Sequence, residues 1–180
     1  MEPKEAKAES KSKSEFRGRR LTKEEFGQVP HVIARPKARY AWACGSAMSR
    51  FLEELKQGRI IARRCNRCRR VLVPPRMFCE RCFRQTDEWV YLPGTGVIET
   101  FSISYIDQAA RRLPEPILVG VVAFDGASEH CGIMHYFGEV APEKIYIGME
   151  VEPVWKPEVE RKGAITDIKY FRPRREEDRR

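Results

Sequence analysis

The sequence contains no long hydrophobic run and no sign of a membrane or export signal. The longest apolar stretch, residues 117–124, is interrupted by Gly120, whereas a transmembrane helix needs about 20 apolar residues. The first residues are charged and lack the hydrophobic region of a secretory signal. We therefore expect no membrane association and predict a cytoplasmic location.

Motifs of several enzyme classes are also missing. The chain has no Walker-type phosphate loop, dinucleotide-binding glycine fingerprint or zinc-protease helix motif. Cys131 and His135 could in principle act as nucleophile and base, but strand residues four apart are separated by about 13 Å. We predict packing or interface roles for both, and no catalytic residue in this chain.

The sequence does contain two Cys-x-x-Cys pairs, Cys65/Cys68 and Cys79/Cys82, with ten residues between them. Each pair can supply two thiolates from one tight turn, and zinc takes four such ligands tetrahedrally at about 2.3 Å. Closely spaced cysteines are typical of metal sites in a reducing compartment, with paired disulfides as the alternative. We predict one structural zinc ion on these four cysteines. A site closed by four thiolates leaves no open position for catalysis.

Basic residues outnumber acidic ones by 34 to 26, and the excess is greatest around the cysteines. Within residues 63–84 a single acid, Glu80, stands among eight arginines: Arg63, Arg64, Arg67, Arg69, Arg70, Arg76, Arg81 and Arg84. Arginine pairs bidentately with phosphate or carboxylate. An anion-binding or interface role is one interpretation, and a solvated surface is the other.

Composition and periodicity divide the chain into five parts. We predict a disordered charged extension (1–30), a helical docking arm (31–58), the zinc ribbon (59–87), a small barrel (88–173) and a charged tail (174–180). The helix is expected over 38–57, with Tyr40, Cys44, Phe51 and Leu55 on its apolar side. Gly45 and Ser46 could divide it into two shorter helices. Because a single amphipathic helix needs a packing surface, another subunit could supply one.

From Gly96 onward the hydrophobic period changes to two, which indicates strands. The odd positions of 97–105 are mostly apolar, so Phe101 and Tyr105 are predicted on the core face, and 107–116 is predicted as a polar loop. Further strands are expected at 117–124, 129–137, 149–155 and 165–171, with one helical turn at 141–144. The fold class is therefore mainly β with an N-terminal helix, ending in a small closed barrel like an OB-fold.

Several motifs occur in one order along residues 38–173: Gly58-Arg59-Ile60-Ile61, Cys65-x-x-Cys68, Pro74-Pro75-Arg76, Cys79-x-x-Cys82, Trp89, Gly94-x-Gly96, Ile147-Gly148-Met149-x-Val151 and Phe171-Arg172-Pro173. In this order the chain resembles the zinc-ribbon/OB-fold family known as domain of unknown function 35. The resemblance implies a helical arm, a rubredoxin-like zinc ribbon and a C-terminal OB-fold. It also implies a small accessory subunit of a thiolase-superfamily acyl-CoA enzyme, in a hetero-oligomer whose large partner carries the catalytic cysteine.

The resemblance further implies that coenzyme A thioesters are ligands of such a complex. Arginines can pair with the phosphates of coenzyme A and an aromatic ring can stack on its adenine, so Tyr105, Arg111 and Arg112 are the candidate contacts. The alternative is a single-stranded nucleic-acid-binding protein, since zinc ribbons and OB-folds both serve that role. That role needs exposed aromatic side chains, so placing Phe101 and Tyr105 on the core face disfavours it.

Overall fold

The computed structural model describes residues 18–30, 32 and 40–175, and the chain divides into two units, 1–41 and 42–180. The first unit contains helix α1 (Lys23–Gly27), none of whose residues is buried. A capping box begins this helix: the Thr22 hydroxyl accepts from the Glu25 N–H, and the Thr22 N–H donates to the Glu25 carboxylate. The predicted disordered extension lies largely outside the described residues.

Helix α2 (Gly45–Lys56) packs its apolar side inside this chain. It begins later than predicted, because Gly45 has a φ of 72°, a left-handed conformation that separates the helix from the residues before it. Cys44 is therefore exposed rather than packed. Phe51 and Leu55 are buried in the same core as the ribbon and barrel residues. This chain itself therefore supplies the packing surface for Phe51 and Leu55, which another subunit could have supplied.

The ribbon consists of a three-stranded antiparallel sheet and a separate short hairpin. The sheet has the order β2-β1-β5, and the hairpin pairs β3 with β4. Their bounds are β1 Ile60–Arg64, β2 Val71–Leu72, β3 Phe78–Cys79, β4 Arg84–Gln85 and β5 Glu88–Leu92. Strands β1, β2 and β5 lie close to residues 59–63, 71–73 and 88–92. The sequence predicts strands there because each is a short hydrophobic segment bounded by turn residues.

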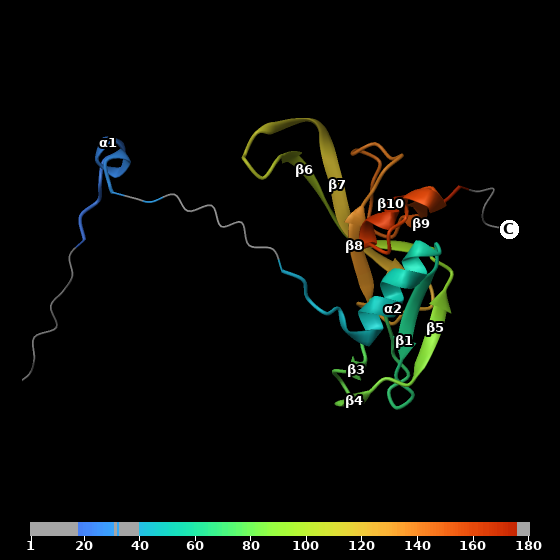
Figure 1. Cartoon of the computed structure of the whole chain (residues 1–180). Helices are drawn as coiled ribbons and strands as arrows, with labels where there is room; N and C mark the ends of the chain where they lie inside the picture. Colours follow the sequence, from blue (N-terminus) through green and yellow to red (C-terminus); the bar gives the residue numbers. More distant parts are fainter. Residues whose placement is uncertain (1–17, 31, 33–39, 176–180) are drawn as a thin grey trace, which may run out of the picture. The chain divides into compact units, whose positions relative to one another are not determined.

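The barrel is a five-stranded antiparallel sheet with the strand order β10-β9-β6-β7-β8. Figure 1 shows these strands beside the ribbon. The strands are β6 Gly96–Ile106, β7 Arg112–Phe124, β8 Gly132–Tyr136, β9 Glu150–Trp155 and β10 Ile168–Pro173. Two 3₁₀ turns, Glu158–Glu160 and Ile165–Asp167, lie between β9 and β10. Residues 141–144 form a hydrogen-bonded turn in place of the predicted helical turn.

The barrel is less closed than predicted. Among the described residues, β8 and β10 are joined by an isolated parallel bridge between Phe137 and Phe171 and by no continuous ladder. The Gly138 N–H donates to the Phe171 carbonyl at 2.9 Å. Beyond this bridge the His135 side chain bonds to the Ile165 carbonyl at 3.2 Å, so a side chain joins the two sides where backbone pairing stops.

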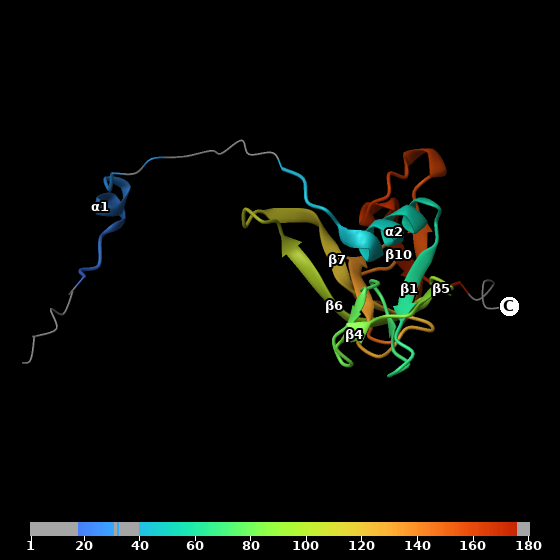
Figure 2. The same ribbon diagram turned by 60° about the horizontal axis from the view of Figure 1, so that its bottom comes forward.

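Strands β6 and β7 form a long hairpin that runs past the barrel (Figures 1 and 2). The register shifts between Ile98 and Thr100, so Ile98 is buried before the bulge and Phe101 is partly buried after it. Tyr105, predicted on the core face, is 54% exposed because this end of the hairpin has left the core. The predicted loop 107–116 is shorter, since β7 already begins at Arg112.

Ribbon and barrel pack around one hydrophobic core. Val71 and Leu72 of the ribbon belong to the same cluster as Val122 and Phe171 of the barrel. Reciprocal bonds join the two parts: the Val71 N–H donates to the Ser128 hydroxyl and the Ser128 N–H to the Val71 carbonyl, each at 2.9 Å. No helix within the described ranges has the length and apolar character that spanning a membrane requires.

Candidate metal centre

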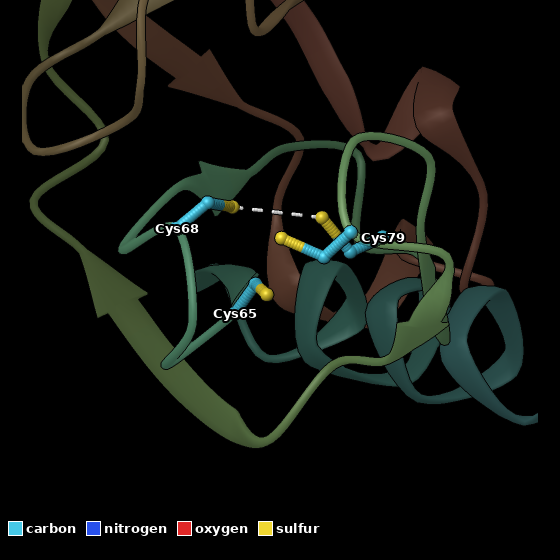
Figure 3. A group of neighbouring side chains, drawn as sticks. Cys65, Cys68 and Cys79 are labelled. Atoms are coloured by element: carbon cyan, nitrogen blue, oxygen red, sulfur yellow. Dashed lines mark hydrogen bonds between the residues drawn. The ribbon is translucent and has the colours of Figure 1, made fainter.

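Two backbone turns bring the four predicted cysteines together. Cys65 and Cys68 lie between β1 and β2, while Cys79 and Cys82 lie in the β3–β4 hairpin. All four Sγ atoms lie within 4.8 Å of one another, and Figure 3 shows three of these side chains converging. The Cys68 and Cys79 Sγ atoms are 3.6 Å apart, close to the roughly 3.8 Å expected between thiolates on a tetrahedral zinc ion. The donor set and spacing fit zinc.

The two turns share one backbone feature and are each closed by a hydrogen bond. The residue after each second cysteine is left-handed, with φ of 61° at Arg69 and 50° at Phe83. In the first turn the Cys65 N–H donates to the Arg70 carbonyl, and in the second the Phe83 N–H donates to the Cys79 carbonyl, both at 2.9 Å. Each turn therefore presents both of its thiols to one point.

The surroundings of the cysteines affect their ionisation differently. The Cys68 backbone N–H, together with that of Arg67, lowers the pKa of Cys65 to about 7, whereas burial raises the pKa of Cys82 to about 12. A bound cation would favour the thiolate form at all four positions. Cys44 and Cys131 lie outside the cluster, and all six cysteines are free thiols.

The arginine-rich surface around the metal centre is more internally paired than the sequence indicated. Arg63 is buried, donates to the Thr86 hydroxyl at 2.9 Å and lies 4.7 Å from the Trp89 ring. Four others have acidic partners: Arg64 with Glu88, Arg70 and Arg76 with Glu80, and Arg84 with Asp87. Two of these acids follow residue 84, so a count over 63–84 omitted them. The predicted anion-binding role therefore has fewer available arginines.

The three coenzyme A candidates lie at the exposed tip of the β6–β7 hairpin. Ile106 pairs with Arg112, which brings Arg112 close to Tyr105. The Arg111 guanidinium lies 2.7 Å from the Asp107 carboxylate, and the Arg111 N–H with that guanidinium holds the pKa of Asp107 below its usual value. All three residues are thus exposed at the same end of one hairpin.

Sequence reasoning missed a cavity of about 390 Å³ on the barrel. It lies where β8 and β10 are not paired, and its lining includes His135, Lys156, Ile165 and Lys169. The lining comes from three strands and the segment between β9 and β10. No local pattern marks such a set, because the fold alone brings these segments together.

The chain is similar to known proteins over the ribbon and the barrel. Residues 52–88 match the rubredoxin-like zinc ribbon domain of ChsH2, and residues 89–156 match its C-terminal OB-fold domain. A DUF35 domain-containing scaffold protein of Methanocaldococcus jannaschii is 30% identical over 117 residues, which cover 63% of this chain and 81% of that protein. A probable enoyl-CoA hydratase alpha subunit of Thermomonospora curvata is 29% identical over 125 residues, which cover 68% of this chain but 36% of that larger protein.

Two solved structures share the fold. One is a protein of unknown function from the DUF35 family of Sulfolobus solfataricus, with a TM-score of 0.53 and 25% identity over 61% of this chain and 78% of that chain. The other is described as an Ltp2-ChsH2(DUF35) aldolase, with a TM-score of 0.50 and 23% identity over 77% of this chain and 98% of that chain. At that identity the second likeness supports the fold alone.

Proposed function

Because this chain belongs to the DUF35 family of zinc-ribbon and OB-fold proteins, we propose that it is a non-catalytic subunit of an acyl-CoA-handling complex. The proposed partner is a thiolase-like protein that carries the nucleophilic cysteine. The observation that carries the proposal is the closed four-cysteine centre. Zinc with four thiolate ligands has no open position for substrate, so the ion would hold the ribbon in shape.

The candidate nucleophile–base pair, Cys131 and His135, also supports a non-catalytic role. Cys131 is 1% exposed, and its Sγ lies 3.5 Å from a guanidinium nitrogen of Arg70. His135 Nδ1 accepts from the Tyr136 N–H at 2.9 Å, which leaves Nε2–H to donate to the Ile165 carbonyl. Burial lowers the pKa of His135. Both groups are thus enclosed and engaged by the fold.

The relatives support a role in an assembly. One is named a scaffold protein, and another a subunit of a probable enoyl-CoA hydratase. By analogy, this chain would bind a larger enzyme and contribute a surface for the thioester. The exposed hairpin tip suits the coenzyme A nucleotide, since Tyr105 offers a ring for adenine and Arg112 a charge for phosphate. Arg111 would have to exchange its Asp107 partner for a phosphate.

The test is reconstitution with the thiolase-like protein that co-purifies with the tagged full chain. Thiolysis of acetoacetyl-CoA is measured with each protein alone and with the mixture, and assembly is followed by size-exclusion chromatography. We expect a hetero-oligomer, no turnover by this chain alone and higher turnover by the mixture. Turnover by the isolated chain, or no effect on an enzyme that it binds, would contradict the proposal.

A paired substitution examines the hairpin tip. Arg111→Glu with Arg112→Glu should raise KM for the thioester while assembly is retained, and Lys144→Glu on another exposed turn is the control. An unchanged KM would remove the tip from the coenzyme A site. Salt-sensitive binding of a (dT)12 oligonucleotide, without any thiolase-like partner, would support the nucleic-acid alternative.

A further inference from the structure

The cavity between β8 and β10 has the features of a ligand site. It encloses about 390 Å³, near the lower end of the roughly 300–1,000 Å³ typical of ligand pockets. Its apolar lining includes Val119 on β7, Met134 on β8, Ile165 in the 3₁₀ turn before β10, and Ile168 at the start of β10. Its lining includes residues of the second and third barrel strands, β7 and β8, and of the segment between the fourth and fifth, which are parts of the surface that OB-folds use for ligands.

The charged residues of the cavity are basic. Lys156 and Lys169 line it, and none of its nine lining residues is acidic. Asp167 lies near Lys156, in the lining of the neighbouring cavity. Its carboxylate is buried and accepts from the backbone N–H groups of Lys162, Gly163 and Ala164. The backbone therefore meets much of the hydrogen-bonding demand of Asp167, and the cavity keeps a positive bias.

The polar wall of the cavity is fixed rather than reactive. His135 is 7% exposed, and both of its ring nitrogens are engaged by backbone groups of Tyr136 and Ile165. Met134 beside it is 71% exposed, and methionine adapts its shape to different apolar surfaces. An apolar chain with a negative group matches this combination of rigid aliphatic walls, one adaptable side chain and two lysines.

We propose that this cavity binds the acyl group of an anionic acyl conjugate. The apolar chain lies against Val119, Ile165 and Ile168, and the oxygen at the end of the chain, a thioester carbonyl or a free carboxylate, faces Lys156 and Lys169. The volume fits an acyl group and not a whole coenzyme A conjugate, whose nucleotide would extend outside. This inference deepens the proposed function and rests on it for the choice of coenzyme A as carrier.

Calorimetric titration of the full chain with octanoyl-CoA, coenzyme A and octanoate tests the inference. Octanoyl-CoA should bind at least about tenfold more tightly than coenzyme A, since each buried methylene adds favourable free energy. Val119→Phe should remove most of that advantage by filling the cavity and leave coenzyme A binding unchanged. Lys156→Glu with Lys169→Glu should weaken octanoyl-CoA and octanoate alike. The matched controls are Val159→Phe, at a position 93% exposed, and Lys144→Glu.

The outcomes separate this inference from the proposed function. Equal affinities for octanoyl-CoA and coenzyme A, or full octanoyl-CoA binding by folded Val119→Phe, would overturn the acyl site even if the complex assembles. Octanoyl-CoA binding that responds to the variants, without any thiolase-like partner, would support the site and contradict the complex. If Val119→Phe does not fold, Ile165→Trp at the half-exposed edge decides by the same criterion. A (dT)12 oligonucleotide that competes with octanoyl-CoA would reassign the face to nucleic acid.

Discussion

The ribbon tip, by which we mean the β3–β4 hairpin, and the barrel belong to one chain but are stabilised in different ways. In the tip, β3 and β4 pair over two residues each, and Phe78 and Phe83 are 51% and 80% exposed. In the barrel, long strands enclose Val122 and Phe171, both 0% exposed. The tip buries little apolar surface, so the metal must supply what burial supplies in the barrel.

From this difference we expect that the two sources of stability can be removed separately, even though the parts share a core. The three-stranded sheet of the ribbon contributes Leu72 to the common cluster. The second Cys-x-x-Cys turn lies outside this sheet, in the separate β3–β4 hairpin. Losing the metal should therefore affect the tip first and the barrel later. The following predictions test that order, beginning with the largest effect.

Cys65→Ser should abolish stoichiometric zinc binding. Three thiolates and a hydroxyl form a much poorer site, and zinc binding contributes about 10–16 kcal/mol in zinc-finger peptides. Metal analysis should give one zinc per chain for the unmodified protein and far less for the variant, with faster proteolysis within 63–86. Cys44→Ser, which changes an exposed cysteine outside the cluster, should keep its zinc. Equal zinc in both variants would contradict the structural-zinc assignment.

Phe171→Ala should destabilise the barrel without removing zinc. The ring lies 5.8 Å from that of Phe124 and 5.7 Å from that of His135, and truncating a buried phenylalanine costs about 3–5 kcal/mol. Urea unfolding should show this loss, and metal content should stay at one per chain. Phe83→Ala in the exposed tip should change the free energy of unfolding by no more than about 0.5 kcal/mol. Equal losses in the two variants would contradict the contrast between tip and barrel.

Asp167→Asn should have a smaller effect that depends on pH. Although burial alone raises the pKa of Asp167, N–H groups of residues 162–164 lower it below its ordinary value. The folded carboxyl thus has the lower pKa, so its stabilisation is fully present above the unfolded pKa of about 3.9. The variant should lose about 1–3 kcal/mol at pH 7, and the difference should shrink as pH falls below 4.

Urea unfolding of both proteins at pH 7 and pH 3 measures this difference. Glu143→Gln, at an exposed position of the turn between β8 and β9, is the control and should show no such pH-dependent difference. Because both proteins keep the same four cysteines, any loss of zinc at low pH is common to them and cancels in the comparison. A difference that stays constant over this pH range would mean that the carboxylate charge does not stabilise the fold.

Much of the fold followed from local patterns. The predicted strand 88–92 has the bounds of β5, because short apolar segments bounded by turn residues are a local signal. The sequence left open a break of the predicted helix at Gly45, and only the left-handed φ of that residue decided that α2 begins there. Tyr105 was misplaced because the end of the β6–β7 hairpin extends beyond the core (Figure 1), which strand periodicity does not reveal. The five predicted domain boundaries stay predictions.

The sequence by itself determined the metal centre. All four ligands lie within residues 65–82, and each pair is positioned by a short turn. Only the tertiary structure decided that Arg64 pairs with Glu88 on a neighbouring strand, and that Val119, Met134 and Ile168 line one cavity. The physical reason is the distance along the sequence between the residues involved. A Cys-x-x-Cys turn is specified by neighbouring residues, whereas a cavity depends on how strands distant in sequence pair and where their pairing stops.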